Sequence, residues 1–167
     1  MESAYLGIDV GSISVNLVVI DEGLRPLTRL YLRSQGQPLR VMQEGLRAIA
    51  REVGRVMRIR GVGTTGSGRH LAGILVGADV IKNEITAHAV AALQCEPLVR
   101  SIIEIGGQDS KFTVLRNGTV SDFAMNTVCA AGTGSFLDQQ AHRLGIPIEV
   151  FGEYALRARK PVKIASR

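Results

Sequence analysis

Short apolar runs separated by turn residues open the chain. They lie at residues 5–10, 15–20 and 27–32, and each is rich in Val, Ile, Leu or Tyr. A Gly-Ser pair at 11–12 follows the first run, and Asp-Glu-Gly at 21–23 follows the second. Runs of this length bounded by Gly, Ser and Asp are typical of β-strands joined by tight turns. The chain is therefore predicted to begin with three consecutive strands.

A helical spacing of apolar residues follows from Pro38, a residue type favoured at the first helical position. The helix is predicted to run to about residue 57. Its apolar side carries Leu39, Met42, Leu46, Ile49, Val53 and Val56. Arginines lie on the opposite side, at Arg40, Arg47, Arg51, Arg55 and Arg58. This helix is therefore expected to cover the sheet formed by the opening strands.

The next elements are shorter. A strand is predicted at 59–64, a helix at about 69–75, and a further helix capped by Asn83 or Thr86. Together with the opening strands they give the order β-β-β-α-β-α-α.

The pattern restarts near residue 100. Strands are predicted at 101–105, 111–115 and 119–125, with a Gly-Gly turn at 106–107 and an Asn-Gly hairpin at 117–118. Helices are predicted at 134–144 and 149–157, and a β-like run at 162–165. The chain is thus of the α/β class, with a first lobe at 1–98 and the start of a second at 99–167.

The two lobes open alike. Asp9 and Glu104 each end a strand, and an apolar residue and a glycine turn follow each of them. A repeated β-hairpin with a carboxylate at the same place indicates an internal duplication, and we expect the two lobes to face a cleft.

Composition fits one compact domain or two small lobes, with 46% hydrophobic and 21% charged residues among 167. The chain has no apolar run long enough to span a membrane and no basic leader, so we expect a cytoplasmic protein without a membrane partner. Two cysteines are too few for a disulfide framework and favour a reducing compartment. The net charge of +5 could indicate nucleic acid, but the arginines suit a solvated helix face and only 4% of residues are aromatic. We therefore expect no nucleic-acid partner.

The glycine turns carry the first candidate chemistry. At Gly11, backbone N–H groups can cradle phosphate oxygens, and Ser12 and Ser14 add hydroxyl donors. Asp9 is placed to hold Mg²⁺, in part through water. A plain hairpin with an Asx turn is the alternative. The repeat at Glu104, with Gly106 and Gly107 in its turn, favours phosphate binding.

Gln108 and Asp109 follow the second turn. The amide could orient an attacking water, and the carboxylate could contact Mg²⁺ or accept a proton. Ordinary turn polarity is the alternative.

Cys129 lies in a glycine-rich run before a predicted helix, whose dipole stabilises a thiolate. An iron ligand or a nucleophile fits this position, and a small buried residue is the alternative. For Cys95, at a helix end among alanines, the buried structural role is the prediction. An iron–sulfur cluster needs four ligands, so if Cys129 binds one, the other ligands must come from outside this chain.

Five ordered blocks of sequence resemble one known family. They read GIDVGS at 7–12, GSGR at 66–69, NEITAHA at 83–89, EIGGQDSK at 104–111 and NTVCAAGTGSFLD at 126–138. With these blocks the chain resembles the activator ATPases of 2-hydroxyacyl-CoA dehydratases and benzoyl-CoA reductases. The resemblance implies the ribonuclease H-like, actin-like ATPase fold of the acetate and sugar kinase, Hsp70 and actin superfamily.

The resemblance also implies a mechanism. In that family two protomers share a [4Fe–4S] cluster, and ATP hydrolysis drives low-potential electrons from it to an iron–sulfur dehydratase or reductase. The implied cofactors are ATP, Mg²⁺ and the cluster, the assembly is a homodimer, and ferredoxin or flavodoxin is the electron donor. Cys129 matches the first cluster cysteine, and the second is expected beyond 162–167. The chain is thus expected to be an N-terminal fragment that is inactive and free of cluster by itself.

The implied site residues gather at the two turns and at the cysteine segment. The catalytic set is Asp9, Glu104, Gln108 and Asp109, and the binding set is Gly11, Ser12, Ser14, Gly106, Gly107, Lys111, Gly132 and Gly134. The chain departs from the family pattern at Ile13, Asn16 and Glu104, where Thr, Lys and Asp are usual. These departures bear on phosphate affinity and metal geometry. A small-molecule kinase of the same fold and a nucleotide-sensing module without turnover are the alternative functions.

Overall fold

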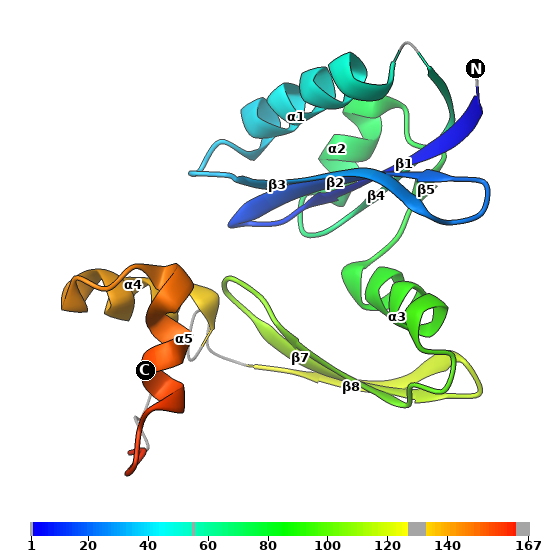
Figure 1. Ribbon diagram of the computed structural model, residues 1–167. Helices are drawn as coiled ribbons and strands as arrows, with labels where there is room; N and C mark the ends of the chain where they lie inside the picture. Colours follow the sequence, from blue (N-terminus) through cyan, green and yellow to red (C-terminus); the bar gives the residue numbers. More distant parts are fainter. Residues whose placement is uncertain (1, 55, 127–132, 163–167) are drawn as a thin grey trace. The chain divides into compact units, whose positions relative to one another are not determined.

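The computed structural model describes residues 2–54, 56–126 and 133–162 (Figure 1). The chain divides into two compact units, Met1–Pro97 and Leu98–Arg167.

The first unit is built on a five-stranded sheet in the order β3-β2-β1-β4-β5. The strands are β1 (Glu2–Val10), β2 (Ser14–Asp21), β3 (Pro26–Arg33), β4 (Met57–Thr65) and β5 (Val80–Ile81). β1, β2 and β3 pair antiparallel, whereas β4 pairs parallel to β1 and β5 parallel to β4. The three opening strands are confirmed. β5 was not predicted, because two residues are too short to show a period.

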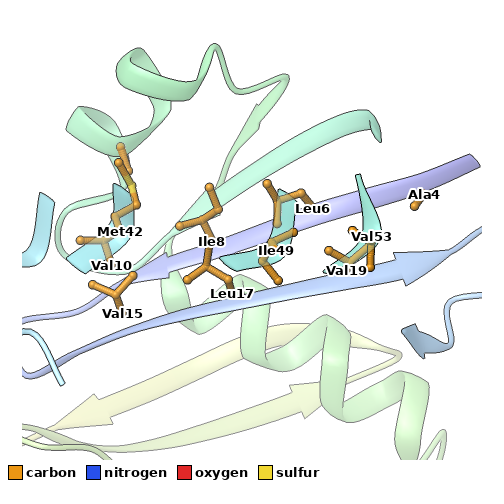
Figure 2. Packing of buried hydrophobic residues seen from close by; sticks show 11 residues of the cluster. Ala4, Leu6, Ile8, Val10, Val15, Leu17, Val19, Met42, Ile49 and Val53 are labelled. Atoms are coloured by element: carbon orange, nitrogen blue, oxygen red, sulfur yellow. The ribbon is translucent and has the colours of Figure 1, made fainter. Parts of the chain in front are cut away.

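Two helices, α1 (Pro38–Val53) and α2 (Arg69–Val76), lie on the same side of this sheet (Figure 1). Figure 2 shows the core that they cover, in which alternate residues of β1 and β2 face Met42, Ile49 and Val53 of α1. Burial of each large apolar side chain contributes about 1.5–3 kcal/mol. This core includes Leu6, Ile8, Val10, Val15, Leu17 and Val19.

α1 ends earlier than predicted. It stops at Val53, followed by Gly54, and the chain enters β4 at Met57, which pairs with Glu2. Glycine is a poor helix former, and the strand pairing takes over the residues that the apolar spacing had assigned to the helix.

α3 (Glu84–Cys95) lies on the other side of the sheet (Figure 1). Asn83 caps it, as predicted, because its side chain accepts a 2.8 Å hydrogen bond from the Thr86 N–H. The prediction that Cys95 is buried is wrong. It is the last residue of the helix and is exposed. Ala89 is the buried residue in the described part of α3, so the rest of the chain covers little of this helix.

The turn between β2 and β3 is held by Asp21, whose carboxylate accepts hydrogen bonds of 2.9 Å from the backbone N–H and from Nε of Arg25. The backbone hydrogen bond, more than any other contact, holds the pKa of Asp21 below its ordinary value of 3.8.

The second unit begins with a three-stranded antiparallel sheet in the order β6-β7-β8. Its strands are β6 (Ser101–Ile105), β7 (Ser110–Arg116) and β8 (Thr119–Met125). The helices α4 (Gly134–Leu144) and α5 (Ile148–Leu156) follow, and Gly145 ends α4 in the left-handed conformation with a φ of 67°. Most of the β-like run predicted at 162–165 lies outside the described residues. Over the described ranges, no helix is both long enough and apolar enough to cross a bilayer.

Candidate functional site

Turn 1, at residues 11–14, joins β1 to β2. The Gly11 N–H donates to the Ser14 carbonyl at 2.9 Å and closes the turn. Ser34, which is 1% exposed, holds the turn from behind, because its hydroxyl donates to the Ser12 carbonyl and its N–H to the Ile13 carbonyl, both at 2.8 Å. In the described part of the chain, the N–H groups of Ser12 and Ile13 meet no acceptor. Turn 1 therefore keeps two backbone donors available for an anion.

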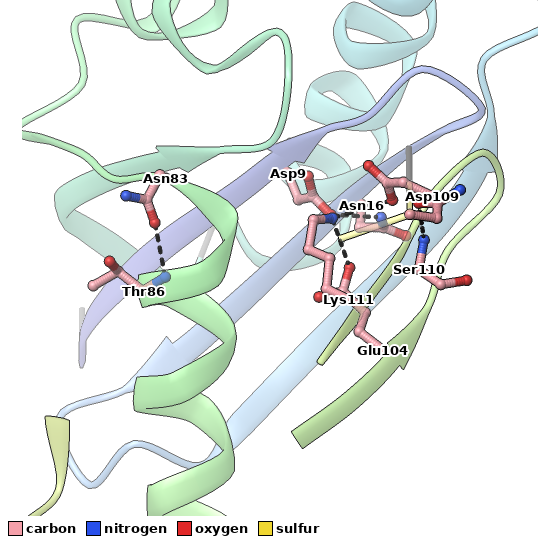
Figure 3. Close-up of polar contacts among 9 residues, drawn as sticks. Asp9, Asn16, Asn83, Thr86, Glu104, Asp109, Ser110 and Lys111 are labelled. Carbon is pink, nitrogen blue, oxygen red and sulfur yellow. Dashed lines mark hydrogen bonds and ion pairs between the residues drawn. The ribbon is translucent and has the colours of Figure 1, made fainter. Parts of the chain in front are cut away.

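Asp9 lies beside this turn, at the end of β1. Its neighbours Ile8 and Val10 face the core, so the alternation of the strand places Asp9 on the opposite face. Asn16 pairs with it across the hairpin and donates from Nδ2 to Asp9 Oδ2 at 3.1 Å (Figure 3). The same Nδ2 lies 3.4 Å from Ser14 Oγ. The amide thus links the carboxylate to the end of turn 1.

Turn 2, at residues 106–109, joins β6 to β7 with the same pattern. The Gly106 N–H donates to the Asp109 carbonyl at 2.8 Å. Among the residues that the structure describes, none accepts from the N–H groups of Gly107 and Gln108. The two turns therefore share their closing hydrogen bond and their available donors, and both suit phosphate oxygens.

The carbonyls of turn 2 hold the start of α4. Gly106 O accepts from the Gly134 N–H at 2.9 Å, and Gly107 O accepts from the Ser135 N–H at 2.8 Å. The Thr133 hydroxyl adds a 3.0 Å bond to Gly107 O, and Thr133 is fully buried. The first residues of α4 thus donate to turn 2, where helix starts commonly have unsatisfied N–H groups.

Lys111 lies across the hairpin from Glu104 and binds two carboxylates (Figure 3). Its Nζ lies 3.3 Å from Glu104 Oε1 and 3.1 Å from Asp109 Oδ1. The lysine side chain is 3% exposed, whereas those of Glu104 and Asp109 are 22% and 40% exposed. The register that pairs Asp9 with Asn16 in the first unit pairs Glu104 with Lys111 in the second.

Magnesium would find few protein ligands here. Across residues 2–54, 56–126 and 133–162, no cluster of three or more His, Cys, Asp or Glu side chains could hold a metal ion. A single carboxylate such as that of Asp9 fits Mg²⁺, which keeps several waters and takes one or two carboxylates together with substrate phosphates. The donor set therefore fits a hydrated ion that arrives with a nucleotide.

The predicted site residues fall into separate groups. Asp9, Gly11, Ser12 and Ser14 gather at turn 1, and Glu104, Gly106, Gly107, Gln108, Asp109, Lys111 and Gly134 gather at turn 2. Cys129 and Gly132 lie outside the described residues. Sequence reasoning missed Ser34 and Thr133 as supports of the turns, because each acts on a partner more than 20 residues away, at separations of 22 and 26.

Comparison with known proteins identifies a family. Residues 6–167 match the family described as the BadF/BadG/BcrA/BcrD ATPase family. The chain is 35% identical over 167 residues to the (R)-2-hydroxyglutaryl-CoA dehydratase activating ATPase of Acidaminococcus fermentans, covering 96% of this chain and 61% of the relative. It is 29% identical over 168 residues to one of the benzoyl-CoA reductase subunits of Thauera aromatica, covering 96% and 57%. The chain therefore spans about three fifths of the length of these relatives.

Solved structures of members of this family have the same fold as this chain. The activator of the 2-hydroxyisocaproyl-CoA dehydratase from Clostridium difficile, with bound ADPNP, is 32% identical with a TM-score of 0.80, over 98% of this chain and 60% of that one. A Streptomyces griseus glucokinase of the ROK family, at 14% identity, has a TM-score of 0.54 over 77% of this chain and 49% of that one, and shares the fold alone. The predicted actin-like ATPase fold is confirmed.

Proposed function

The chain belongs to the BadF/BadG/BcrA/BcrD ATPase family, and we propose that it forms the phosphate-binding part of an ATP-dependent activator of a CoA-ester dehydratase or reductase. The relatives that carry such names support this role. The proposal extends to low-potential electron transfer, to a homodimeric assembly and to a ferredoxin or flavodoxin as the electron donor.

The observation that carries the proposal is the joint between turn 2 and α4. The peptide group with the Gly107 N–H carries the Gly106 carbonyl, and the one with the Gln108 N–H carries the Gly107 carbonyl. Both carbonyls accept hydrogen bonds from the start of α4. Cys129 precedes this helix start by only a few residues in the sequence. A change at the phosphate-binding turn would therefore reach the start of α4 through three hydrogen bonds, and α4 follows the cysteine segment in the sequence.

Each turn has a defined task in the proposed hydrolysis. At turn 1 the N–H groups of Ser12 and Ile13 and the hydroxyls of Ser12 and Ser14 bind phosphate oxygens, and at turn 2 the N–H groups of Gly107 and Gln108 do so. Gly11 and Gly106, which were expected to donate as well, instead close the two turns with their N–H groups. Asp9 holds the hydrated Mg²⁺, which neutralises phosphate charge when bound. Asp109 is proposed as a catalytic carboxylate that accepts a proton. Gln108 orients the attacking water from its place in turn 2.

Lys111 and Glu104 act on the carboxylate of turn 2. The ammonium group lies between the two carboxylates and holds Asp109 in place at 3.1 Å. Glu104 binds the same ammonium at 3.3 Å, so its longer side chain is accommodated where the family pattern has Asp.

Cys129 would supply one thiolate of a [4Fe–4S] cluster, and a cluster of this type needs four ligands. The remaining thiolates are proposed to come from a second cysteine of the same protein and from a second copy. The cluster, when bound, provides electrons at low potential. Gly132 and Gly134 are proposed to belong to the nucleotide-binding set.

The test removes one hydrogen bond between turn 2 and the start of α4 and leaves the N–H groups that bind phosphate unchanged. Thr133→Val removes the 3.0 Å hydroxyl bond to Gly107 and keeps the side-chain volume. In the intact, anaerobically purified protein we expect ATP binding to remain, while more ATP is hydrolysed for each electron delivered to the partner enzyme.

Thr119→Val is the matched control, because the Thr119 hydroxyl also donates to a carbonyl of the same unit, that of Arg116 at 2.9 Å, but on an exposed turn. If the Thr133 variant, the control and the wild type hydrolyse the same amount of ATP for each electron delivered, the hydrogen bonds between turn 2 and α4 do not link hydrolysis to electron transfer. Absence of ATP hydrolysis in the wild type, or a phosphorylated small molecule as its product, would refute the activator function.

A further inference from the structure

Thr65 ends β4 and carries a buried hydroxyl oxygen. Within the part of the chain that the structure describes, Thr65 Oγ1 has no hydrogen-bond partner. An unsatisfied buried hydroxyl costs stability, so a hydroxyl of this kind indicates a hydrogen-bond partner that comes from outside the protein.

The neighbouring threonine shows what a satisfied hydroxyl looks like here. Thr64 is 3% exposed and donates to the Arg69 carbonyl of α2 at 2.9 Å. Alternation along β4 places Thr65 on the opposite face of the sheet, which is the face of Asp9. Adjacent residues of one chemical type thus have different surroundings.

Thr65 is the register partner of Asp9 in the parallel pair of β1 and β4. Both residues line a cavity of about 670 Å³ within the first unit, together with Asn16 and Lys82. The carboxyl ends of parallel strands are the usual place for ligands in α/β sheets. The hydroxyl therefore lies beside the carboxylate at an edge suited to binding.

The position of the Asp9 carboxylate is restricted on both sides. Asn16 binds Oδ2, and the α-carbon of Gly66 packs so closely that an added Cβ would lie 2.3 Å from Oδ1. Gly66 has a φ of +85°, and its carbonyl is fixed by the N–H and Nη1 of Arg69 at 3.3 and 3.0 Å. The carboxylate next to Thr65 is thus held in one place.

We propose that Thr65 is a further binding residue of the Asp9 site, whose hydroxyl hydrogen-bonds to the hydrated Mg²⁺ of the bound nucleotide. This inference rests on the proposed function. A threonine hydroxyl can accept a hydrogen bond from a metal-bound water while it donates to a phosphate oxygen. The ligand class is a Mg²⁺–nucleoside phosphate, and this role explains why the oxygen has no protein partner.

Thr65→Val tests the proposal, because valine keeps the shape and suits a strand. The measurement is the calorimetric affinity of the intact protein for ADPNP, with Mg²⁺ and with EDTA. We expect the gain in affinity due to Mg²⁺ to fall by roughly three- to tenfold, the effect of one net hydrogen bond. The affinity in EDTA and the melting temperature stay level, or the melting temperature rises.

Two further variants separate binding from structure. Thr65→Ser keeps the hydroxyl and restores the Mg²⁺-dependent gain. Thr64→Val removes a satisfied hydroxyl, so it lowers the melting temperature and leaves the gain unchanged. A Thr65→Val protein with the full wild-type gain overturns the role of Thr65 alone. A wild type that binds ADPNP no better with Mg²⁺ than with EDTA overturns both this role and the proposed function.

Discussion

Replacing Lys111 by methionine removes the ammonium group that lies between Glu104 and Asp109. In the wild type its Nζ is 3.3 Å and 3.1 Å from their carboxylate oxygens. Methionine fills a similar volume with an apolar side chain and leaves two carboxylates near each other without that cation. Both the lost attraction and the new repulsion destabilise the hairpin of β6 and β7.

The magnitude follows from the exposure of the three groups. Loss of one partner of a fully buried ion pair costs about 3–5 kcal/mol, and an exposed pair is worth about 0–1 kcal/mol. Lys111 is 3% exposed, whereas Glu104 and Asp109 keep 22% and 40% of their side-chain surface in contact with solvent. We therefore expect an intermediate loss of about 2 kcal/mol, or a fall of roughly 4–8 °C in melting temperature.

Amide hydrogen exchange gives the assay, because it reports the stability of β6 and β7 separately from the first unit. Protection of their amides should fall by roughly thirtyfold, which corresponds to about 2 kcal/mol. Arg40→Gln is the control, since the Arg40–Glu44 pair is also close, at 3.0 Å, but 70% and 52% exposed. If Lys111→Met costs no more than this control, the ion pairs of turn 2 contribute nothing to its stability.

Other predictions concern single positions. Gly45→Ala should lower the free energy of unfolding by about 1–3 kcal/mol, because the new Cβ would lie 2.6 Å from a leucine of the sheet. Gly152→Ala should raise it by up to about 1 kcal/mol, because its Cβ would meet nothing within 4 Å, and urea denaturation compares the two variants. Asn83→Ala should cost about 1 kcal/mol and lower helical circular dichroism, and an unchanged signal would argue against the cap. The carboxyl ¹³C signal of Asp21 should titrate below 3.8. Because its folded pKa is lowered, its contribution is present above pH 3.8 and is lost as the pH falls through that pKa. A midpoint at 3.8 or above would contradict the role of the Arg25 N–H.

Local signals made much of the fold predictable. The strands β1, β2 and β3 follow from apolar runs and turn residues, and α4 starts and ends at the glycines expected of it, Gly134 and Gly145. The end of α1 was missed because strand pairing at Met57 decides it, and exposure of Cys95 depends on what covers α3. Such outcomes depend on packing rather than on local spacing.

The candidate residues were proposed from the sequence, whereas the residues that support the two turns were not. Asp9, Gly11, Glu104 and Gly106 were proposed because the chain repeats the same hairpin signal, and their roles stay predictions. Nothing in the sequence marks Ser34 as a support of turn 1, because serine is common in loops. Its partners, Ser12 and Ile13, also lie far from it in the sequence, Ser12 at a separation of 22 residues. The grouping of these residues into one nucleotide site stays a prediction.

The carbonyl contacts behind each turn have an electronic consequence. A peptide group is conjugated, so an anion that binds its N–H draws charge toward its oxygen and strengthens the hydrogen bond accepted there, by about 10–30% in cooperative chains. At turn 2 the donors to these carbonyls are the Gly134 and Ser135 amides, and at turn 1 the donor to the Ser12 carbonyl is the Ser34 hydroxyl. Phosphate bound at the N–H end of a peptide group would thus polarise its carbonyl end without any backbone displacement, and the amide proton shifts of Gly134 and Ser135 would move downfield together.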